Sequence, residues 1–301
     1  MNKQEETPPA TSGRTIRYLC EAALAYLAYG IMRVLPVRAA SYLGGFILRW
    51  VGPHLKSAEI ARGNLKRAFP NKSAEDREEI MRAMWENLGR MVGEYPHLSN
   101  LKPRVEIVGG EHLARGTGRA KIFFGGHISN WEVAGIAALA FNVNLFAVYR
   151  RPNNKFLDGL LYRARESVWY GQIAKSHRGA REIMAVLKRG DALGLLVDQK
   201  LNTGGVPVPF FGAPAMTAPT IAHLALRMPC DVHPFRVERL PGARFRITIE
   251  APLRIVRSGD HSADVLSILT QTNSRLENWI KATPAEWLWI HRRWDMKVGE
   301  R

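Results

Sequence analysis

His127 and Glu132 are the two residues whose types and spacing could do chemistry. They stand in the stretch Lys121-Ile-Phe-Phe-Gly-Gly-His-Ile-Ser-Asn-Trp-Glu132. An imidazole can remove a proton from a hydroxyl group, and a carboxylate beside it can fix the tautomer of the ring and stabilise the imidazolium that forms. The pair therefore predicts a general base with its orienting partner, suited to the attack of an alcohol on an acyl thioester.

The elements around this pair must bring the two side chains together. We expect residues 122–124 to form a buried strand, the two glycines after it a turn, and residues 129–132 the opening of a helix. On a continuous helix a five-residue step turns one side chain roughly 140° away from the other. The prediction therefore places His127 in the loop and Glu132 in the first helical turn, where the carboxylate can reach the ring.

A plainer interpretation of the same stretch stays open. Ser129 and Glu132 have the spacing of a capping box, in which Glu132 needs no catalytic duty. The two glycines favour the catalytic interpretation, because backbone N–H groups near Gly125 and Gly126 could approach a substrate and hold a developing oxyanion.

Strands and helices alternate after residue 103. The expected strands cover residues 105–108, 122–124, 143–149, 192–197, 232–237 and 245–250, and the expected helices cover residues 130–141, 156–170, 178–189, 217–227 and 263–282. This alternation predicts an α/β fold with a central mixed or parallel sheet flanked by helices. Sites in such sheets lie at the carboxyl ends of strands, where both His127 and Asp198 would fall.

The first hundred residues carry no strand signal. Residues 18–35 and 37–51 are apolar but contain charges, so neither reaches the ~18–20 uninterrupted apolar residues of a spanning helix. Flanking arginines favour helices that lie in a membrane interface, with a pair of buried helices as the alternative. We divide the chain into a disordered tail (1–17), a helical, membrane-associating N-terminal region (18–100) and an α/β domain (101–301).

Charge and cysteine usage narrow the class of partner. The 301 residues carry a formal charge of +16, which predicts a negative partner: nucleic acid, an acidic carrier protein or an anionic bilayer. Residues 150–189 hold ten Lys or Arg and three acidic residues, close to the proposed chemistry.

Cys20 and Cys230 lie far apart, which fits a reducing compartment. No Gly-x-Ser-x-Gly elbow, P-loop or His-Glu-x-x-His motif is present, which disfavours serine hydrolases, nucleotide enzymes and zinc enzymes.

The stretch from Gly126 to Glu132 resembles the His-x4-Asp/Glu motif of glycerolipid acyltransferases. It is most similar to the late acyltransferases of bacterial lipid A biosynthesis, the lauroyl and myristoyl transferases. Further segments agree with that family: residues 63–70, 85–90, 149–154, 197–200, 208–212 and 287–293. The resemblance spans roughly residues 60–294.

The resemblance implies roles for individual residues. His127 would be the base and Glu132 its charge-relay partner. The implied substrate-binding residues are Gly125, Gly126, Asn130, Arg150, Asp198, Phe210, Phe211, His291 and Arg292. Arg150 could hold a phosphate by paired hydrogen bonds, or form a surface salt bridge. Asp198 could instead cap backbone amides.

Two aromatic segments have open interpretations as well. Phe210 and Phe211 could form the wall of an acyl-chain pocket, or an ordinary buried loop. Trp287 and Trp289, ahead of His291 and Arg292, could form an interfacial belt followed by phosphate-binding cations, or pack on the core.

The predicted function is transfer of a fatty acyl chain from acyl carrier protein, or from coenzyme A, to a hydroxyl of an anionic lipid, foremost a lipid A precursor. A lysophospholipid or an aminolipid acceptor is the alternative, and a non-catalytic basic protein that binds membranes or nucleic acid is the alternative from another class. We expect no metal, no other cofactor and no nucleic-acid partner. The expected location is the cytoplasmic side of a bacterial inner membrane, peripheral or anchored by the N-terminal region.

Overall fold

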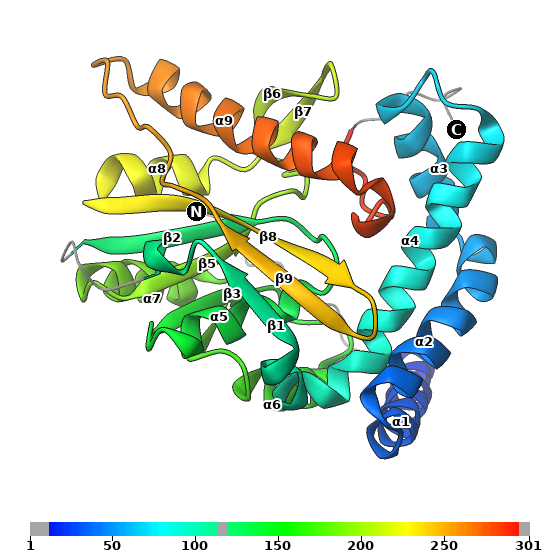
Figure 1. The fold of residues 1–301 in the computed structure, drawn as a ribbon. Helices are drawn as coiled ribbons and strands as arrows, with labels where there is room; N and C mark the ends of the chain where they lie inside the picture. The colour runs from blue at the N-terminus through cyan, green and yellow to red at the C-terminus, as the bar shows by residue number, and fades with distance from the viewer. Residues whose placement is uncertain (1–11, 114–118, 295–301) are drawn as a thin grey trace.

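A seven-stranded sheet forms the centre of the protein in its computed structural model, which describes residues 12–113 and 119–294. The strands are β1 (Val105–Val108), β2 (Ala120–Gly125), β3 (Leu145–Tyr149), β4 (Gly171–Ala174), β5 (Ala192–Leu196), β8 (Cys230–Leu240) and β9 (Arg244–Ile249). Their order is β1-β9-β8-β2-β5-β3-β4 (Figure 1). β2, β3, β4, β5 and β8 run parallel, β9 is antiparallel to β8, and β1 is parallel to β9. The predicted α/β fold with a mixed, largely parallel sheet is confirmed.

Alternate side chains of β2 enter two separate hydrophobic clusters, one on each face of the sheet. The helices that follow strands are α5 (Ala134–Ala140), α6 (Asp158–Glu166), α7 (His177–Lys188), α8 (Thr220–Arg227) and α9 (His261–Ala282). Ile122 and Phe124 belong to the cluster that includes buried residues of α7, α8 and α9, whereas Phe123 belongs to the one that includes α5. The two-residue period of a strand thus buries β2 on both faces.

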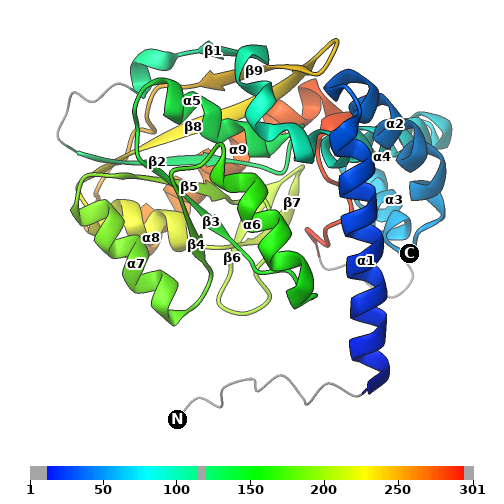
Figure 2. The same ribbon diagram turned by 90° about the horizontal axis from the view of Figure 1, so that it is seen from below.

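Four helices form the N-terminal region: α1 (Ser12–Val34), α2 (Val37–Val51), α3 (Ser57–Ala68) and α4 (Ala74–Glu94). α2 and α4 pack backbone to backbone, and a Cβ atom at Gly44 would lie 2.2 Å from the carbonyl oxygen of Gly89. α1 lies at the edge of the molecule as a long rod beside them (Figure 2). Glycine at this contact is required because any side chain would push the two helices apart.

Helices α1 and α2 both expose large apolar side chains to solvent. The exposed side chains are Ile16, Leu19, Leu24, Tyr26, Leu27, Ile31 and Val34 on α1, and Tyr42, Phe46, Ile47, Trp50 and Val51 on α2. Within residues 12–113 and 119–294, no helix combines the length and apolar character needed to cross a bilayer.

The start of α1 differs from the prediction. The disordered tail was expected to extend to residue 17, but α1 begins at Ser12. The reason is that the last proline of this end is Pro9, so no proline interrupts residues 12–17, and Gly13 weakens a helix there without breaking it. Residues 1–11 lie outside the described residues, and the division of the chain at residue 100 stays a prediction.

Two further strands form a hairpin that the prediction did not contain, β6 (Val206–Phe210) and β7 (Ala213–Thr217). Pro207 and Pro209 are exposed and alternate with the buried Val208 and Phe210. Proline is tolerated here because a two-stranded sheet leaves one side of each strand without a ladder partner. The helix expected from Thr217 therefore begins three residues later. β4 was also missed, because its four residues follow a basic helix without a clear alternation.

Candidate active site

Four parallel strands of the sheet end at one edge, and each is followed by a side chain with possible chemistry. His127 and Asp198 each come two residues after their strands, β2 and β5. Arg150 directly follows β3, and Lys175 directly follows β4. A cavity of about 360 Å³ opens at this edge, with His127, Glu132, Arg150, Lys175, Gln199 and His291 among its lining residues. The predicted positions of His127 and Asp198 at the carboxyl ends of strands are confirmed.

His127 is held by Asp198. The imidazole Nδ1 lies 2.7 Å from Asp198 Oδ1, and the backbone N–H of His127 donates to Oδ2 at 2.8 Å. The indole Nε1 of Trp287 donates to the same Oδ2 at 2.7 Å. Because an ionised carboxylate can only accept, Nδ1 carries the proton of the neutral ring, and Nε2 on the cavity side presents a lone pair.

The environment of Asp198 keeps it ionised. The side chain is 1% exposed. Burial by itself raises the pKa of Asp198. The attraction of the His127 ring in its protonated form and the hydrogen bonds from His127 and Trp287 outweigh burial, so the pKa lies well below its ordinary value. The alternative interpretation of Asp198 is confirmed, since the carboxylate caps the backbone amide of His127. The carboxylate also orients the imidazole, and a contact of Asp198 with substrate stays a prediction.

The predicted pairing of His127 with Glu132 is wrong. Glu132 is buried and paired with Arg165 of α6, whose Nε lies 2.9 Å from Oε2 and whose Nη2 lies 2.6 Å from Oε1. Burial lowers the pKa of Arg165, but the charge and hydrogen bonds of Glu132 outweigh it and leave the pKa above its ordinary value. A catalytic role for Glu132 itself stays a prediction.

The reason for the different pairing is local. Residues Trp131–Val133 form a short 3₁₀ turn, and it is Trp131 whose ring packs edge-on against the His127 imidazole, with 4.9 Å between ring centroids. The capping-box alternative is also wrong, because the residue at the N-cap is Asn130, which makes no side-chain cap. Ser129 instead takes a left-handed backbone conformation, with φ of 56°.

A C-terminal segment, residues 286–288, forms backbone hydrogen bonds with the loop that carries His127. Leu288 N–H donates to the carbonyl oxygen of His127 at 3.0 Å, and Ser129 N–H donates to the carbonyl oxygen of Glu286 at 2.9 Å. Ile128 N–H donates to the carbonyl oxygen of Gly126 at 2.8 Å. With Asp198 bound to the N–H of His127, the three successive backbone N–H groups of residues 127–129 all have protein acceptors.

The two glycines pack against protein. A Cβ atom at Gly125 would lie 2.8 Å from the Phe235 ring, and one at Gly126 would lie 2.9 Å from Leu276 and 3.3 Å from the Asp198 carboxylate. Both glycines are buried. Their small size therefore serves the close packing of the loop, and the predicted oxyanion hole from backbone N–H groups gains no support from residues 127–129.

Gln199 is a site residue that the sequence analysis did not select. Its Nε2 lies 3.3 Å from Nε2 of His127 and 3.0 Å from Nε2 of His291. The two imidazole rings are 5.3 Å apart between centroids. Burial is the main cause that lowers the pKa of His291, with a further contribution from His127. The position of Gln199 directly after Asp198, within a segment shared with the family, was the available signal.

Arg150 and Lys175 give the cavity a cationic rim. Among the described residues neither side chain takes part in an ion pair. Partial burial of its ammonium group is the main cause that lowers the pKa of Lys175 below its ordinary value. The side chain as a whole is exposed. Lys175 was not selected from the sequence because β4 was missed. Two cations without carboxylate partners suit an anionic group of a substrate.

Several predicted substrate-binding residues lie elsewhere. Asn130 is fully buried and donates to Glu94 at 2.9 Å, where it ties the loop to α4. Phe210 is the last residue of β6 and is fully buried against Trp287, so the acyl-chain wall is wrong for this ring. Phe211 is half-buried, packs on Trp289 and does not line the cavity at His127, so its role in an acyl-chain pocket stays a prediction.

The C-terminal segment also differs from the prediction. Trp287 and Trp289 are 1% and 0% exposed, so they form no interfacial belt. Arg292 is exposed and does not line the cavity, whereas its neighbour Arg293 is fully buried. Of the two residues predicted as cations in this segment, His291 lines the cavity and Arg292 does not.

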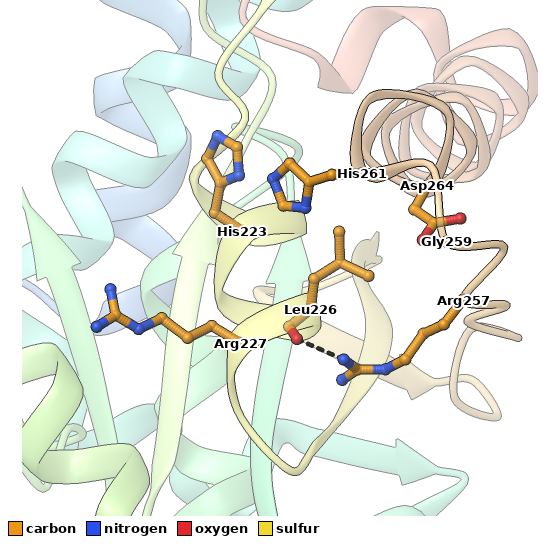
Figure 3. Close-up of a pocket in the computed structure, with 7 residues that line it drawn as sticks. All are labelled: His223, Leu226, Arg227, Arg257, Gly259, His261 and Asp264. Carbon is orange, nitrogen blue, oxygen red and sulfur yellow. Dashed lines mark hydrogen bonds between the residues drawn. The ribbon is translucent and has the colours of Figure 1, made fainter.

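A second hollow of about 550 Å³ lies between the end of α8 and the start of α9 (Figure 3). His223 and His261 stack there, and Arg257 donates to the carbonyl oxygen of Leu226. α8 precedes β8, so this hollow lies at the amino-terminal edge of the parallel strands, away from His127. Its one carboxylate, Asp264, is bound to Ser258, and no base has an orienting acid.

Within residues 12–113 and 119–294, no three His, Cys, Asp or Glu side chains are grouped as metal ligands would be.

Comparisons with known proteins point to one family. The sequence model of the bacterial lipid A biosynthesis acyltransferases matches residues 10–296. The lipid A biosynthesis palmitoleoyltransferase of Escherichia coli is 27% identical over 281 residues, which cover 88% of each chain. The lipid A biosynthesis acyltransferase of Haemophilus influenzae is 23% identical over 265 residues, covering 84% of this chain and 83% of the relative. A solved 1-acyl-sn-glycerophosphate acyltransferase from Thermotoga maritima has a TM-score of 0.37 at 14% identity, covering 88% of this chain and 99% of that one.

Proposed function

Because the chain belongs to the bacterial lipid A biosynthesis acyltransferase family and is an acyltransferase, we propose that it moves a fatty acyl chain from a thioester donor to a hydroxyl group of an anionic lipid A precursor. The observation that carries the proposal is the state of His127. Its Nδ1 is bound to the buried Asp198 carboxylate, and its Nε2 faces a cavity with a cationic rim.

The reaction follows from this arrangement. The acceptor hydroxyl gives its proton to Nε2 of His127 as its oxygen attacks the thioester carbonyl, and Asp198 stabilises the imidazolium that forms. The new C–O bond gives a tetrahedral oxyanion. Its collapse breaks the C–S bond, and the proton passes from His127 to the departing thiolate. Atoms and charge balance without a further reactant.

The cationic rim suits an anionic acceptor. Arg150 and Lys175 lie at neighbouring strand ends, on the same side of the cavity. A guanidinium can hold a phosphate by two parallel hydrogen bonds, and an ammonium adds a point charge. The acceptor hydroxyl would then lie deeper, at His127. A lysophospholipid or an aminolipid acceptor remains the second candidate, because the same cations suit a lipid phosphate or carboxylate.

The exposed apolar face of α1 and α2 suits a membrane surface. It carries leucine, phenylalanine, tyrosine and tryptophan side chains on two adjoining helices, among them Leu24, Phe46 and Trp50. We propose that this face lies in the interfacial region of the bilayer, on the cytoplasmic side of the inner membrane. The acceptor lipid could then reach the cavity without leaving the membrane.

Acyl carrier protein is the proposed donor, and the start of α7 its proposed docking site. α7 begins just after Lys175 at the cavity rim, and Arg178 and Arg181 are exposed there. Charge reversal of both, Arg178→Glu with Arg181→Glu, is expected to raise the donor KM about tenfold while kcat changes little, because rim charges act mainly on association. Steady-state kinetics with acyl carrier protein thioesters, at low and high salt, measure this.

The matched control reverses an exposed arginine of β9, Arg244→Glu, and β9 is separated from β4 in the sheet by β8, β2, β5 and β3. An equal rise of the donor KM in this control, or none in the double variant, would contradict docking at α7. An acyl-coenzyme A donor unaffected by the double variant would support it further.

The function itself is tested with the purified protein and defined lipids. Vesicles containing a lipid A precursor, a lysophospholipid or an aminolipid are incubated with acyl carrier protein or coenzyme A thioesters, and products are identified by mass spectrometry. We expect the lipid A precursor to gain one acyl chain from the carrier-protein donor. Acylation of only the lysophospholipid or aminolipid would replace the proposed acceptor, and binding of bare DNA without any acyl transfer would favour the non-catalytic alternative.

A further inference from the structure

We propose that Gln199 is a catalytic residue whose side-chain amide donates a hydrogen bond to the oxyanion of the tetrahedral intermediate. This inference rests on the proposed acyl transfer. In the structure without substrate, the amide is held between His127 and His291. The amide becomes available to the oxyanion when the acceptor hydroxyl replaces it as the hydrogen-bond partner of His127 Nε2.

The backbone N–H groups of residues 127–129, beside the proposed base, already have acceptors within the protein. Acyl transfer through a tetrahedral intermediate needs donors aimed at the developing negative charge, commonly backbone N–H groups beside the reactive residue. In this loop the N–H groups of residues 127, 128 and 129 donate to Asp198, Gly126 and Glu286. Since those groups are occupied by acceptors within the protein, a side chain is the better source of the donor.

The second support is the geometry of the amide. Gln199 Nε2 is a donor only, and it faces Nε2 of His127, which presents a lone pair because Nδ1 is bound to Asp198. The contact at 3.3 Å is at the long end of hydrogen bonds, whereas the contact to His291 at 3.0 Å is ordinary. His291 therefore positions the amide, and the weaker contact to His127 is the one that an incoming hydroxyl can replace.

The third support is the place of the oxyanion. An attacking oxygen bound to Nε2 of His127 lies about 2.8 Å from it, so the acyl carbon and its oxyanion form within roughly 3 to 4 Å of that nitrogen. The amide nitrogen is 3.3 Å from the same Nε2, so a small rotation of the side chain brings its N–H within hydrogen-bond reach of that region. Its two N–H groups allow one to remain on His291 while the other turns to the oxyanion, without movement of the backbone.

The position of Gln199 in the chain makes the arrangement rigid. It directly follows Asp198, whose carboxylate is bound by His127 and Trp287. The base, its orienting acid and the proposed oxyanion donor are therefore fixed to one another through two neighbouring residues of one loop. A donor prepared in this way loses little freedom when the charge develops.

The test compares Gln199→Met, which keeps the length of the side chain and removes the donor, with Gln199→Glu, which places a carboxylate near the oxyanion. We expect Gln199→Met to lower kcat about 100-fold with KM within about threefold of wild type, and Gln199→Glu to lower kcat further. The matched control is Gln271→Met on α9, whose amide donates to the carbonyl oxygen of Arg254, and its kinetics should be unchanged.

A second measurement separates a catalytic from a structural role. Calorimetry gives the affinity of each variant for a phosphonate analogue of the tetrahedral intermediate and for a thioether analogue of the donor that lacks the carbonyl group. Loss of an oxyanion donor weakens the phosphonate in proportion to kcat and leaves the thioether unchanged. Loss of kcat with unchanged phosphonate affinity would overturn the inference, as would a kcat of Gln199→Met within about threefold of wild type.

The outcomes also separate this inference from the proposed function. If wild type transfers no acyl group to any lipid, the proposed function fails. If wild type is active, His127→Ala is inactive and Gln199→Met is fully active, the proposed function stands and the role of Gln199 is wrong. Thermal unfolding of each variant shows whether it is folded, and Gln199→Glu, of nearly the same size, supplies the phosphonate test if the methionine variant does not fold.

Discussion

Replacement of His127 by alanine is expected to lower kcat for acyl transfer about 1000-fold or more, because the acceptor hydroxyl then has no base to take its proton. The fold should survive, since the imidazole is partly exposed to the cavity and the backbone contacts of residue 127 do not depend on the side chain. Mass spectrometry of total lipids from a deletion strain complemented with either form measures the loss in cells. Single-turnover assays measure it with purified protein.

The matched control is His223→Ala, since His223 is an exposed histidine in the second hollow at the other edge of the sheet (Figure 3). It should restore every lipid that wild type restores. If His127→Ala at equal expression restored them as well, His127 would not be the base, and the proposed mechanism would be wrong.

The second large effect is expected at Asp198, and it distinguishes two carboxylates. Asp198→Asn should lower kcat about 1000-fold or more, because an amide cannot accept from Nδ1 and from the two N–H groups at Oδ2 together, and the imidazole loses its orientation and tautomer. Glu132→Gln should act first on stability. It leaves the Arg165 guanidinium buried without a carboxylate, at a cost of about 3–5 kcal/mol.

Chemical denaturation measures the loss of stability in Glu132→Gln, and kinetics on the folded fraction of each variant measure the loss of kcat. The double variant Glu132→Gln with Arg165→Met removes both charges and should recover much of the lost stability. A folded Glu132→Gln variant as inactive as Asp198→Asn would return the charge-relay role to Glu132, in agreement with the family motif.

The depressed pKa of Asp198 also gives a pH dependence of stability. A carboxyl whose pKa is lower in the folded than in the unfolded state stabilises the fold fully above the unfolded value, about 3.9, and loses that contribution as the pH falls through the folded value. Thermal unfolding below pH 4 should therefore show a steeper loss of stability in wild type than in Asp198→Asn. Parallel curves for the two proteins would mean that Asp198 is not ionised in the folded state.

Local pattern in the sequence was enough for most of the elements and for the position of His127. Buried runs, glycines and helix caps depend on neighbouring residues, so the alternation of strands and helices after residue 103 and the position of His127 after β2 could be predicted without the fold. The helix boundary at Thr217 was wrong because Thr217 is the last residue of β7, and pairing of β7 with β6 is not visible in the local pattern. β4 was missed because four residues are too few to show a period.

The sequence by itself determined that a histidine stands at the carboxyl end of a buried strand in a basic acyltransferase chain. Only the tertiary structure decided which acid holds it. Glu132 is five residues from His127, but the 3₁₀ turn at residues 131–133 directs its carboxylate to Arg165. Asp198 is 71 residues away, yet β2 and β5 pair in parallel and bring it to the imidazole. The C-terminal segment places Trp287 against Asp198 and His291 against Gln199. Spacing along a chain limits which side chains can meet, and the packing of strands selects the ones that do.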